Sequence, residues 1–321
     1  MNVKSKVNAQ LVEADKQVQP VFRILSLDGG GAKGFYTIGI LEEIEAMMKQ
    51  PLCGCFDLIF GTSTGAIIAA LLARGESVAK VKSLYESHVP KIMGCWTSNG
   101  RSAALKELAD DVFGKAKFDV FKTNLGIVAT RWKDECPMIF KTSVEQAHGS
   151  KDSFQPGFGC TVADAIVASC SAYPFFKRPE ITTGKGDIIL VADGGFCANN
   201  PTLYAIADAT RSLKQPYESL RVLSLGVGSY PEPRTWRSLL KLFPTIPFIQ
   251  KIMGTNTCSM ETLRFILFGN LKTVRISETF NEPEMATDLL EHDLKKLNRL
   301  IQKGRNSFGK HEQDIRNLLF N

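Results

Sequence analysis

The chain has 321 residues, 44% of them hydrophobic and 22% charged, which is typical of a soluble globular protein with one large domain or two small ones. Its net charge of +6 fits a solvated basic face, and it is also compatible with an anionic membrane surface or a phosphorylated ligand. The eight cysteines have neither the density of a disulfide scaffold nor the spacing of a zinc site, so we expect neither. No apolar stretch is long enough to span a membrane, so we expect no membrane-spanning helix.

Residues 1–20 are polar and lack the apolar core of a signal peptide, so we expect a mobile N-terminal arm and a cytoplasmic protein. Beyond this arm, strand-like segments alternate with helical ones. The predicted strands are residues 22–27, 56–60, 125–130, 137–141, 187–193 and 221–228, and the predicted helices are residues 35–48, 64–74, 162–172 and 203–213. Such alternation is typical of a buried, mostly parallel sheet, so the predicted class is α/β, with a three-layer core at residues 21–228.

The pattern changes after residue 228. Residues 229–321 begin with proline-rich segments and continue with helical patterns, and leucines within 286–308 form one apolar stripe. We therefore predict a helical C-terminal extension that packs on the same domain. The aromatic stretches at 172–179 and 235–248 mix apolar side chains with Lys and Arg, which suits either a membrane-docking surface or lid, or an ordinary buried loop.

The motif Gly61-Thr62-Ser63-Thr64-Gly65 lies between a predicted strand and a predicted helix. In that context a serine occupies a tight turn with its hydroxyl exposed, and the helix that follows stabilises negative charge nearby. The short motif also occurs by chance, but its strand–turn–helix setting indicates a hydrolase nucleophile at Ser63.

A nucleophilic serine needs a base. The four histidines, His88, His148, His292 and His311, lie in contexts that fit a surface or structural role better than catalysis. Asp193 ends a predicted strand and is followed by Gly194 and Gly195. Open α/β sheets place active groups at the carboxyl ends of their strands, so Asp193 is a candidate base for Ser63.

The segment from Asp28 to Gly34, DGGGAKG, joins the first strand to a helix and has two interpretations. It satisfies the dinucleotide fingerprint G-x-G-x-x-G, but that motif also needs an acidic residue at the end of the second strand, where Gly61 stands instead. A P-loop is excluded because Lys33 is followed by glycine. The interpretation that remains is an oxyanion hole built from backbone N–H groups.

The three motifs at residues 28–34, 61–65 and 193–195 resemble the patatin-like phospholipase family in order and spacing, over about residues 21–228. This resemblance implies a patatin-like hydrolase core that uses a serine–aspartate dyad. Ser63 would be the nucleophile and Asp193 the base.

The resemblance also implies roles for the glycine segment. The backbone N–H groups around Gly29, Gly30 and Gly31 would form the oxyanion hole, with Lys33 where the family usually has arginine. Lysine keeps the charge of arginine but lacks its planar fork. The supporting positions of the three motifs are Asp28, Gly34, Gly61, Gly65, Gly194 and Gly195.

Longer stretches, including GAKGFYTIGIL, FDLIFGTSTGAIIAALLA and DGGFCANNPTLYAIADA, are similar to bacterial patatin-like effectors of cyclic-oligonucleotide antiphage signalling. In that group a partner nucleotidyltransferase makes a cyclic dinucleotide, which activates the phospholipase. The similarity implies a lipid acyl hydrolase that acts on glycerophospholipids at the inner face of the bacterial inner membrane. It implies no cofactor beyond the activating cyclic dinucleotide and no DNA or RNA partner, and it is compatible with a homo-oligomer on activation.

The position of the nucleotide site is a separate question. Arg101, Arg131 and Lys133 lie close to tryptophans in the sequence, and a cation beside an aromatic ring suits phosphate pairing with base stacking, so these residues are candidates. An exposed loop with one buried tryptophan explains the same pattern. Two alternative functions also remain open: a constitutive esterase or thioesterase, and a catalytically silent nucleotide- or membrane-binding protein.

Overall fold

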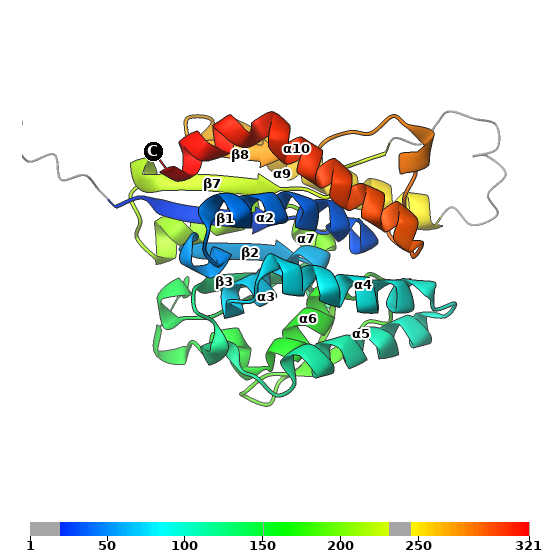
Figure 1. The fold of residues 1–321 in the computed structure, drawn as a ribbon. Coiled ribbons are helices and arrows are strands. Elements are labelled where there is room, and N and C mark those ends of the chain that lie inside the picture. The colour runs from blue at the N-terminus through cyan, green and yellow to red at the C-terminus, as the bar shows by residue number, and fades with distance from the viewer. Residues whose placement is uncertain (1–19, 150, 231–244, 321) are drawn as a thin grey trace, which may run out of the picture.

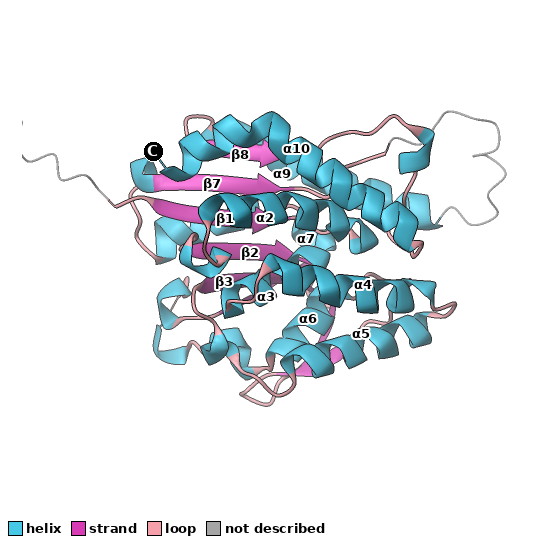
Figure 2. Ribbon diagram, viewed as in Figure 1, coloured by secondary structure: helices cyan, strands magenta, loops and turns pink. Residues whose placement is uncertain are grey.

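A computed structural model describes residues 20–149, 151–230 and 245–320. Residues 1–19 of the N-terminal arm expected at residues 1–20, and residues 235–244 of the 235–248 stretch, therefore lie outside the described residues. A central sheet separates two layers of helices (Figures 1 and 2). This arrangement confirms the predicted three-layer α/β class.

The sheet has strand order β5-β6-β3-β2-β1-β7-β8, with β4 paired to β3 outside this path. The strands are β1 (Phe22–Leu27), β2 (Leu58–Thr62), β3 (Asn124–Arg131), β4 (Cys136–Lys141), β5 (Glu180–Thr182), β6 (Ile188–Asp193), β7 (Leu220–Leu225) and β8 (Thr273–Ile276). The central strands β3, β2, β1, β7 and β8 pair in parallel. The pairs β3–β4, β3–β6 and β5–β6 are antiparallel.

The helices are α2 (Gly34–Met48), α3 (Thr64–Arg74), α4 (Val78–Gly94), α5 (Ser98–Phe113), α6 (Val162–Cys170), α7 (Gly195–Ala198), α8 (Thr202–Ala207), α9 (Thr245–Phe268) and α10 (Leu294–Phe320). Helices α2, α3, α4, α6 and α10 cover one face of the sheet (Figure 1). The other face is covered by α8, with α7 and α9 packed beside it. None of the described helices is long and apolar enough to cross a membrane.

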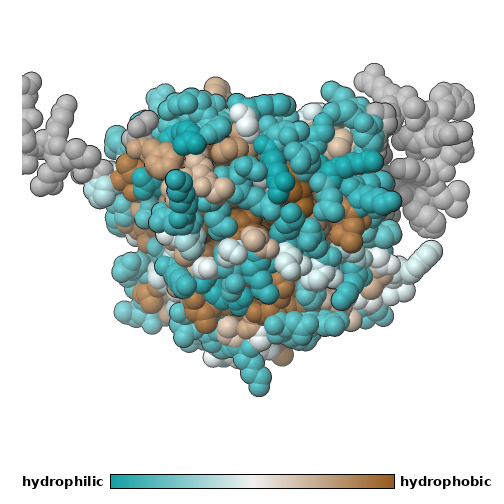
Figure 3. Space-filling model, in the orientation of Figure 1, coloured by the Kyte–Doolittle hydropathy of each residue, from teal (hydrophilic) through white to brown (hydrophobic). Residues whose placement is uncertain are grey.

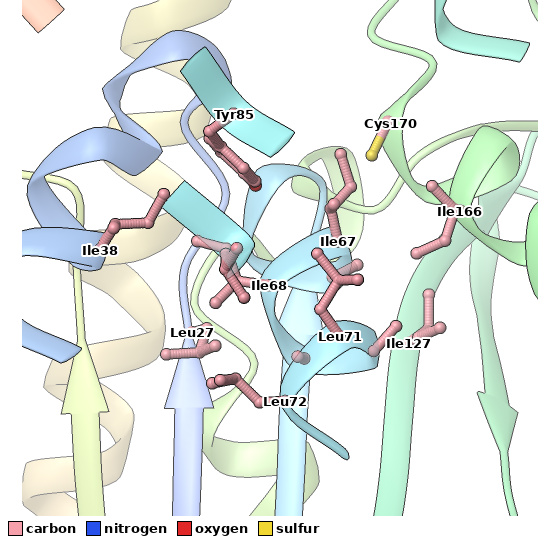
Figure 4. Close-up of a cluster of buried hydrophobic side chains, with 14 of the residues drawn as sticks. Leu27, Ile38, Ile67, Ile68, Leu71, Leu72, Tyr85, Ile127, Ile166 and Cys170 are labelled. Carbon is pink, nitrogen blue, oxygen red and sulfur yellow. The ribbon is translucent and has the colours of Figure 1, made fainter. Parts of the chain in front are cut away.

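Alternate residues of the central strands point into two separate cores. Leu25 and Ile59 belong to the larger cluster, whereas their neighbours Ile24 and Phe60 belong to the cluster on the opposite face. Figure 4 shows part of the larger cluster, where side chains of α3 meet those of β1 and β3. The outward faces of this helix layer are largely hydrophilic (Figure 3). Burial on both faces explains why the strands appear as continuous apolar runs in the sequence.

The C-terminal helix α10 packs directly on α2. A Cβ at Gly39 would lie 2.1 Å from the Ile301 carbonyl oxygen, and a Cβ at Gly304 would lie 2.1 Å from that of Tyr36. The two helices therefore approach each other backbone to backbone, which only glycine permits at these positions.

The described part of 229–321 also contains a strand, which the helical pattern does not predict. β8 pairs in parallel with β7 and extends the sheet. The helix expected from residue 286 begins at Leu294 instead, because the Asp293 carboxylate accepts a hydrogen bond from the Lys295 N–H at 2.8 Å and so caps the first turn.

Candidate active site

Ser63 occupies a strained turn between β2 and α3. Its φ of 54° and ψ of −124° lie in a region that residues other than glycine rarely adopt. The flanking glycines make the turn possible, since a Cβ at Gly61 would lie 2.3 Å from the Gly65 carbonyl oxygen. A Cβ at Gly65 would lie 2.3 Å from that of Leu27. The geometry is that of a nucleophile elbow, which presents the serine hydroxyl at the end of a strand.

The pairing of the strands brings Asp193 to this turn. β2 and β6 lie on the same edge of β3, because β4 occupies its other edge. Thr62 of β2 is opposite Val128, and Asp193 of β6 is opposite the next residue, Ala129. The two strands thus meet end to end, and the Ser63 hydroxyl donates a hydrogen bond of 2.7 Å to Asp193 Oδ2.

Asp193 is buried, and its second carboxylate oxygen accepts a hydrogen bond from the Gly195 N–H at 2.7 Å. Burial raises the pKa of Asp193 to about 7, and the hydrogen bonds from Gly195 and Ser63 oppose this shift. A carboxylate with a pKa near neutrality is suited to take a proton from a serine and return it later. Gly194 is required next to it, because a Cβ there would lie 2.1 Å from the Val128 carbonyl oxygen.

Ser169, at the end of α6, connects these parts and was not identified from the sequence. Its hydroxyl accepts a hydrogen bond from the Ser63 N–H at 2.9 Å and donates one to the Val128 carbonyl at 2.6 Å. Its carbonyl accepts from the Gly194 N–H at 3.2 Å. One side chain and its backbone therefore hold both ends of the dyad, and the only signal in the sequence is a run of small residues, ASCSA.

The glycine segment after β1 lies beside the dyad. The Gly29 N–H donates to the Asn199 carbonyl at 2.9 Å, so it is not free to bind a substrate. Among the described residues, the N–H groups of Gly30 and Gly31 have no protein acceptor, and both glycines line the same pocket as Ser63. These two groups, rather than all three expected donors, are the candidates for an oxyanion hole.

Asp28 anchors the start of the glycine segment. Its carboxylate forms a two-pronged ion pair with Arg275 of β8, in which Arg275 Nη1 lies 2.8 Å from Asp28 Oδ1. Arg275 also donates to the Ser224 hydroxyl at 2.8 Å. The sequence did not indicate Arg275, because β8 itself was not predicted.

Lys33 does not line the pocket of Ser63. Its ammonium lies 3.5 Å from the Gly228 carbonyl, in a separate hollow. Burial lowers the pKa of Lys33, and the negative charge of Asp288 opposes this shift. The Lys33 ammonium therefore makes no direct contact with Ser63 or Asp193.

The pocket above the dyad is strongly apolar. Besides Ser63, Asp193, Gly30 and Gly31, its lining includes Ile67, Tyr85, Val89, Ile92, Met93, Leu105, Leu108, Phe175, Phe176, Met253, Leu289 and Leu290. These side chains come mainly from α4, α5, the segment after α6 and the segment before α10. Such a lining suits a long hydrocarbon chain, with the reacting ester held at the polar end.

The expected nucleotide contacts do not converge. Arg101 of α5 donates to the Phe175 carbonyl at 3.4 Å, whereas Arg131 of β3 pairs with Asp134 at 2.7 Å. Arg131 lines a different surface hollow, and Lys133 is exposed on the turn that follows β3. In the described parts of the chain, no group of three His, Cys, Asp or Glu side chains is arranged to hold a metal ion.

Known proteins are similar to this chain in sequence and in fold. A family model described as patatin-like phospholipase matches residues 25–206. A "cUMP-AMP-activated phospholipase" from Escherichia coli is 54% identical over 301 residues, which cover 93% of this chain and 94% of the relative. A "cGAMP-activated phospholipase" from Pseudomonas aeruginosa is 29% identical over 219 residues, which cover 64% of this chain and 62% of the relative.

A similar fold occurs in the crystal structure of VipD from Legionella pneumophila, with a TM-score of 0.50 at 13% identity, over 90% of this chain and 66% of that chain. This likeness concerns the fold alone. The family assignment follows instead from the model match over more than half of the chain and from the E. coli relative, and it confirms the resemblance seen in the motifs. The chain belongs to the patatin-like phospholipase family.

Proposed function

We propose that this protein hydrolyses acyl ester bonds of membrane glycerophospholipids with Ser63 and Asp193, and that a cyclic dinucleotide activates it. The observation that carries the proposal is the 2.7 Å hydrogen bond between the Ser63 hydroxyl and the Asp193 carboxylate, at the polar end of an apolar pocket. The family supports the lipid substrate.

In the first half of the reaction, Asp193 accepts the proton of the Ser63 hydroxyl while the Ser63 oxygen attacks the acyl carbonyl carbon. The negative charge moves to the former carbonyl oxygen, where the N–H groups of Gly30 and Gly31 stabilise it. The intermediate then collapses, the bond to the glycerol oxygen breaks, and that oxygen takes the proton from Asp193.

In the second half, a water molecule gives a proton to Asp193 and attacks the acyl-enzyme carbonyl. The same two N–H groups stabilise the second tetrahedral intermediate. When it breaks down, Ser63 recovers its proton from Asp193 and a fatty acid leaves. A single carboxylate thus serves as base and acid in both halves, which its pKa of about 7 favours.

Access to a membrane is supported by an exposed tryptophan near the pocket. Trp96 is 97% exposed on the turn between α4 and α5. Met93, in the last turn of α4, lines the catalytic pocket. Tryptophan is favoured at the boundary between lipid headgroups and acyl chains, so we propose that this turn touches the bilayer.

Other side chains at the same end of the molecule suit the same role. The α4–α5 turn, the start of α9 and the start of α10 all lie at the right-hand end in Figure 1. These segments expose Phe248, Leu294, Lys91, Lys251 and Lys295. Apolar side chains among lysines match the chemistry of an anionic lipid surface.

Nucleotide control is supported by the E. coli relative, whose description names cUMP-AMP as its activator. The catalytic pocket also has a free volume of only about 50 Å³. Ligand pockets usually measure about 300–1,000 Å³, so an acyl chain requires the pocket to widen. The proposed setting is bacterial antiphage signalling, with a partner nucleotidyltransferase as the source of the nucleotide and the inner membrane as the target.

The test is hydrolysis of a fluorogenic phospholipid in anionic vesicles, with and without a panel of cyclic dinucleotides. We expect hydrolysis only with a matching nucleotide, and its loss by a factor of about 1,000 or more in Ser63→Ala and Asp193→Asn. The exposed residues Ser83 and Asp119 supply matched controls, Ser83→Ala and Asp119→Asn, which should keep full activity.

Each contrary outcome identifies an alternative. Hydrolysis without any nucleotide would indicate a constitutive esterase. A protein that is folded and binds nucleotide or vesicles but never hydrolyses lipid would be a silent binding protein. Near-normal activity in either dyad variant would refute the assigned chemistry.

A further inference from the structure

A second hollow, of about 800 Å³, adjoins the candidate active site without including Ser63. It is lined by the residues that follow β1, β7 and β8 and by one side of α9, and we call it the β1–β7 hollow. Its volume falls within the range of ligand-binding clefts, about 300–1,000 Å³.

The β1–β7 hollow lies where the order of the strands reverses. From β1 the chain continues to β2 and β3 on one side, whereas β7 and β8 lie on the other side. Neighbouring connections therefore leave β1 and β7 in different directions, which opens a crevice at the carboxyl ends of these strands. Open α/β sheets bind ligands at such switch points.

The hollow contains the Lys33 ammonium, on which the negative charge of Asp288 acts without a close ion pair. Glu261 also lines the hollow, but its carboxylate pairs with Arg264. Among the residues that the structure describes, none with a carboxylate lies within 4.0 Å of the Lys33 ammonium, whose hydrogen-bond partner is the Gly228 carbonyl at 3.5 Å. Hydroxyl groups of Ser229 and Thr279, 3.0 Å apart, also line the hollow. By contrast, the charge of Arg275 is already taken by Asp28. An ammonium and hydroxyl groups in the lining of one hollow are suitable partners for a phosphate group.

The part of the lining that comes from α9 offers an aromatic surface. Phe265 of α9 lines it and is 68% exposed, although an apolar ring of this size is normally buried. A nucleobase can stack on such a ring, and stacking contributes about 1–3 kcal/mol per base. A cation and an exposed aromatic ring in the lining of one hollow fit a ligand that has both phosphates and bases.

We propose that the activating cyclic dinucleotide binds in the β1–β7 hollow, with a phosphodiester on Lys33 and a base on Phe265. This inference rests on the proposed function, because the ligand class follows from the nucleotide control proposed above. It assigns the binding role to a different part of the molecule from Arg101, Arg131 and Lys133, which lie apart from the hollow.

The hollow is connected to the oxyanion loop through hydrogen bonds. Thr257 of α9 accepts a hydrogen bond from the Asn199 side chain at 2.8 Å, and the Asn199 carbonyl accepts one from the Gly29 N–H at 2.9 Å. A ligand that displaces α9 therefore acts on the residue before the candidate donors Gly30 and Gly31. Asn199 is a positioning residue in this arrangement.

The hollow and the catalytic pocket also share part of their walls. Gly30, Met253 and Leu289 line both. A nucleotide that binds more tightly when Met253 and Leu289 have moved would favour the widened pocket, which is how a ligand shifts a conformational equilibrium. The narrow catalytic pocket and the open hollow beside it are thus two parts of one switch.

A labelling experiment tests the site without any substitution. Cys258 lines the hollow from α9 and is exposed, whereas Cys53, which is only partly exposed, lies outside it. With cyclic UMP–AMP at about ten times its Kd, alkylation of Cys258 by N-ethylmaleimide should slow by about tenfold, while that of Cys53 stays unchanged. Unchanged labelling of Cys258 in protein that calorimetry shows to be saturated would overturn the proposal.

Variants give an independent test by calorimetry with the same nucleotide. Lys33→Gln removes the charge, and Thr262→Trp fills the hollow from an exposed position on α9. Each should weaken binding by about tenfold or more. The matched controls Arg131→Gln and Ile188→Trp, which alter a different hollow, should bind normally.

The outcomes separate this inference from the proposed function. If Lys33→Gln and Thr262→Trp bind like the unaltered protein while Arg131→Gln does not, the location is wrong but nucleotide control stands. If the unaltered protein binds no cyclic dinucleotide, both the location and the nucleotide control are refuted. Vesicle hydrolysis then reports separately on the phospholipase activity.

Discussion

Thr62 and Asp193 lie end to end along one edge of β3, opposite the consecutive residues Val128 and Ala129. Ser63, which follows Thr62, is therefore delivered to the Asp193 carboxylate by the register of the sheet. The Asp193 carboxylate is held by the pairing of its strand with β3 and by a hydrogen bond from the Gly195 N–H. This arrangement accounts for a two-residue site whose members are 130 positions apart in the chain.

The protonation of Asp193 should control the reaction. Burial raises its pKa to about 7, and only the ionised carboxylate can accept the serine proton. We expect kcat/KM for a short-chain soluble ester to fall about tenfold for each pH unit below about 7 and to level off above it. A profile that stays flat down to about pH 5 would contradict the assignment of Asp193 as the base.

The same raised pKa should make Asp193 costly for stability. In the folded state Asp193 keeps its proton up to about pH 7, whereas in the unfolded chain its pKa is near 3.8. The protein therefore loses stability as the pH rises through this interval. Asp193→Asn removes the charge. Above neutral pH it should raise the free energy of unfolding by up to about 4 kcal/mol, and the melting temperature should rise with it. This gain should shrink at about pH 4; an equal effect at both pH values would contradict the explanation.

The backbone at Gly31 should be intolerant of a side chain. Its φ is +57°, and a Cβ would lie 2.5 Å from the Leu289 carbonyl oxygen. Gly31→Ala should therefore displace a candidate oxyanion donor and lower kcat by about 100-fold or more. Gly309 in α10 is the matched control, because nothing lies within 4 Å of a Cβ there. Gly309→Ala should keep its activity and stabilise the helix by about 1 kcal/mol, and similar losses in both variants would refute the argument.

Exposed Trp96 should contribute to membrane binding but not to chemistry. Trp96→Asp should weaken co-sedimentation with anionic vesicles by about tenfold or more and leave hydrolysis of a soluble ester unchanged. Phe320 is 55% exposed and is the last residue of α10, whose C-terminal end lies at the opposite end of the molecule in Figure 1. Phe320→Asp is therefore the matched control and should bind vesicles normally. Equal binding by both variants would remove the α4–α5 turn from the proposed lipid contact.

Elements with strong local signals were predicted well from the sequence. The first strand was expected at residues 22–27 and the helix after Ser63 at 64–74, and β1 and α3 have these bounds. Both are apolar runs that end at glycine-rich turns, so burial and turn chemistry point to the same boundaries. The candidate dyad could be named for a similar reason, because each member lies in a short motif at the end of a strand.

Features that depend on distant contacts could not be predicted in this way. β8 has only four residues, one of which is Arg275, and its place in the sheet depends on pairing with β7. The apolar Leu289 and Leu290 suggested an earlier start for α10, but they line the catalytic pocket instead. Ser169 supports the turn at Ser63 only through tertiary hydrogen bonds, which a local sequence pattern does not predict.

The ion pair between Asp28 and Arg275 joins residues that are 247 positions apart. A ribosome makes the chain from its N-terminus, so Ser63, Asp193 and the glycine segment all emerge before this arginine. A buried carboxylate that lacks its partner destabilises its surroundings by about 3–5 kcal/mol. During translation the growing polypeptide therefore carries Ser63 and Asp193 before the partner of Asp28 has been made. The ion pair that anchors the glycine segment can therefore form only after residue 275 has been synthesised.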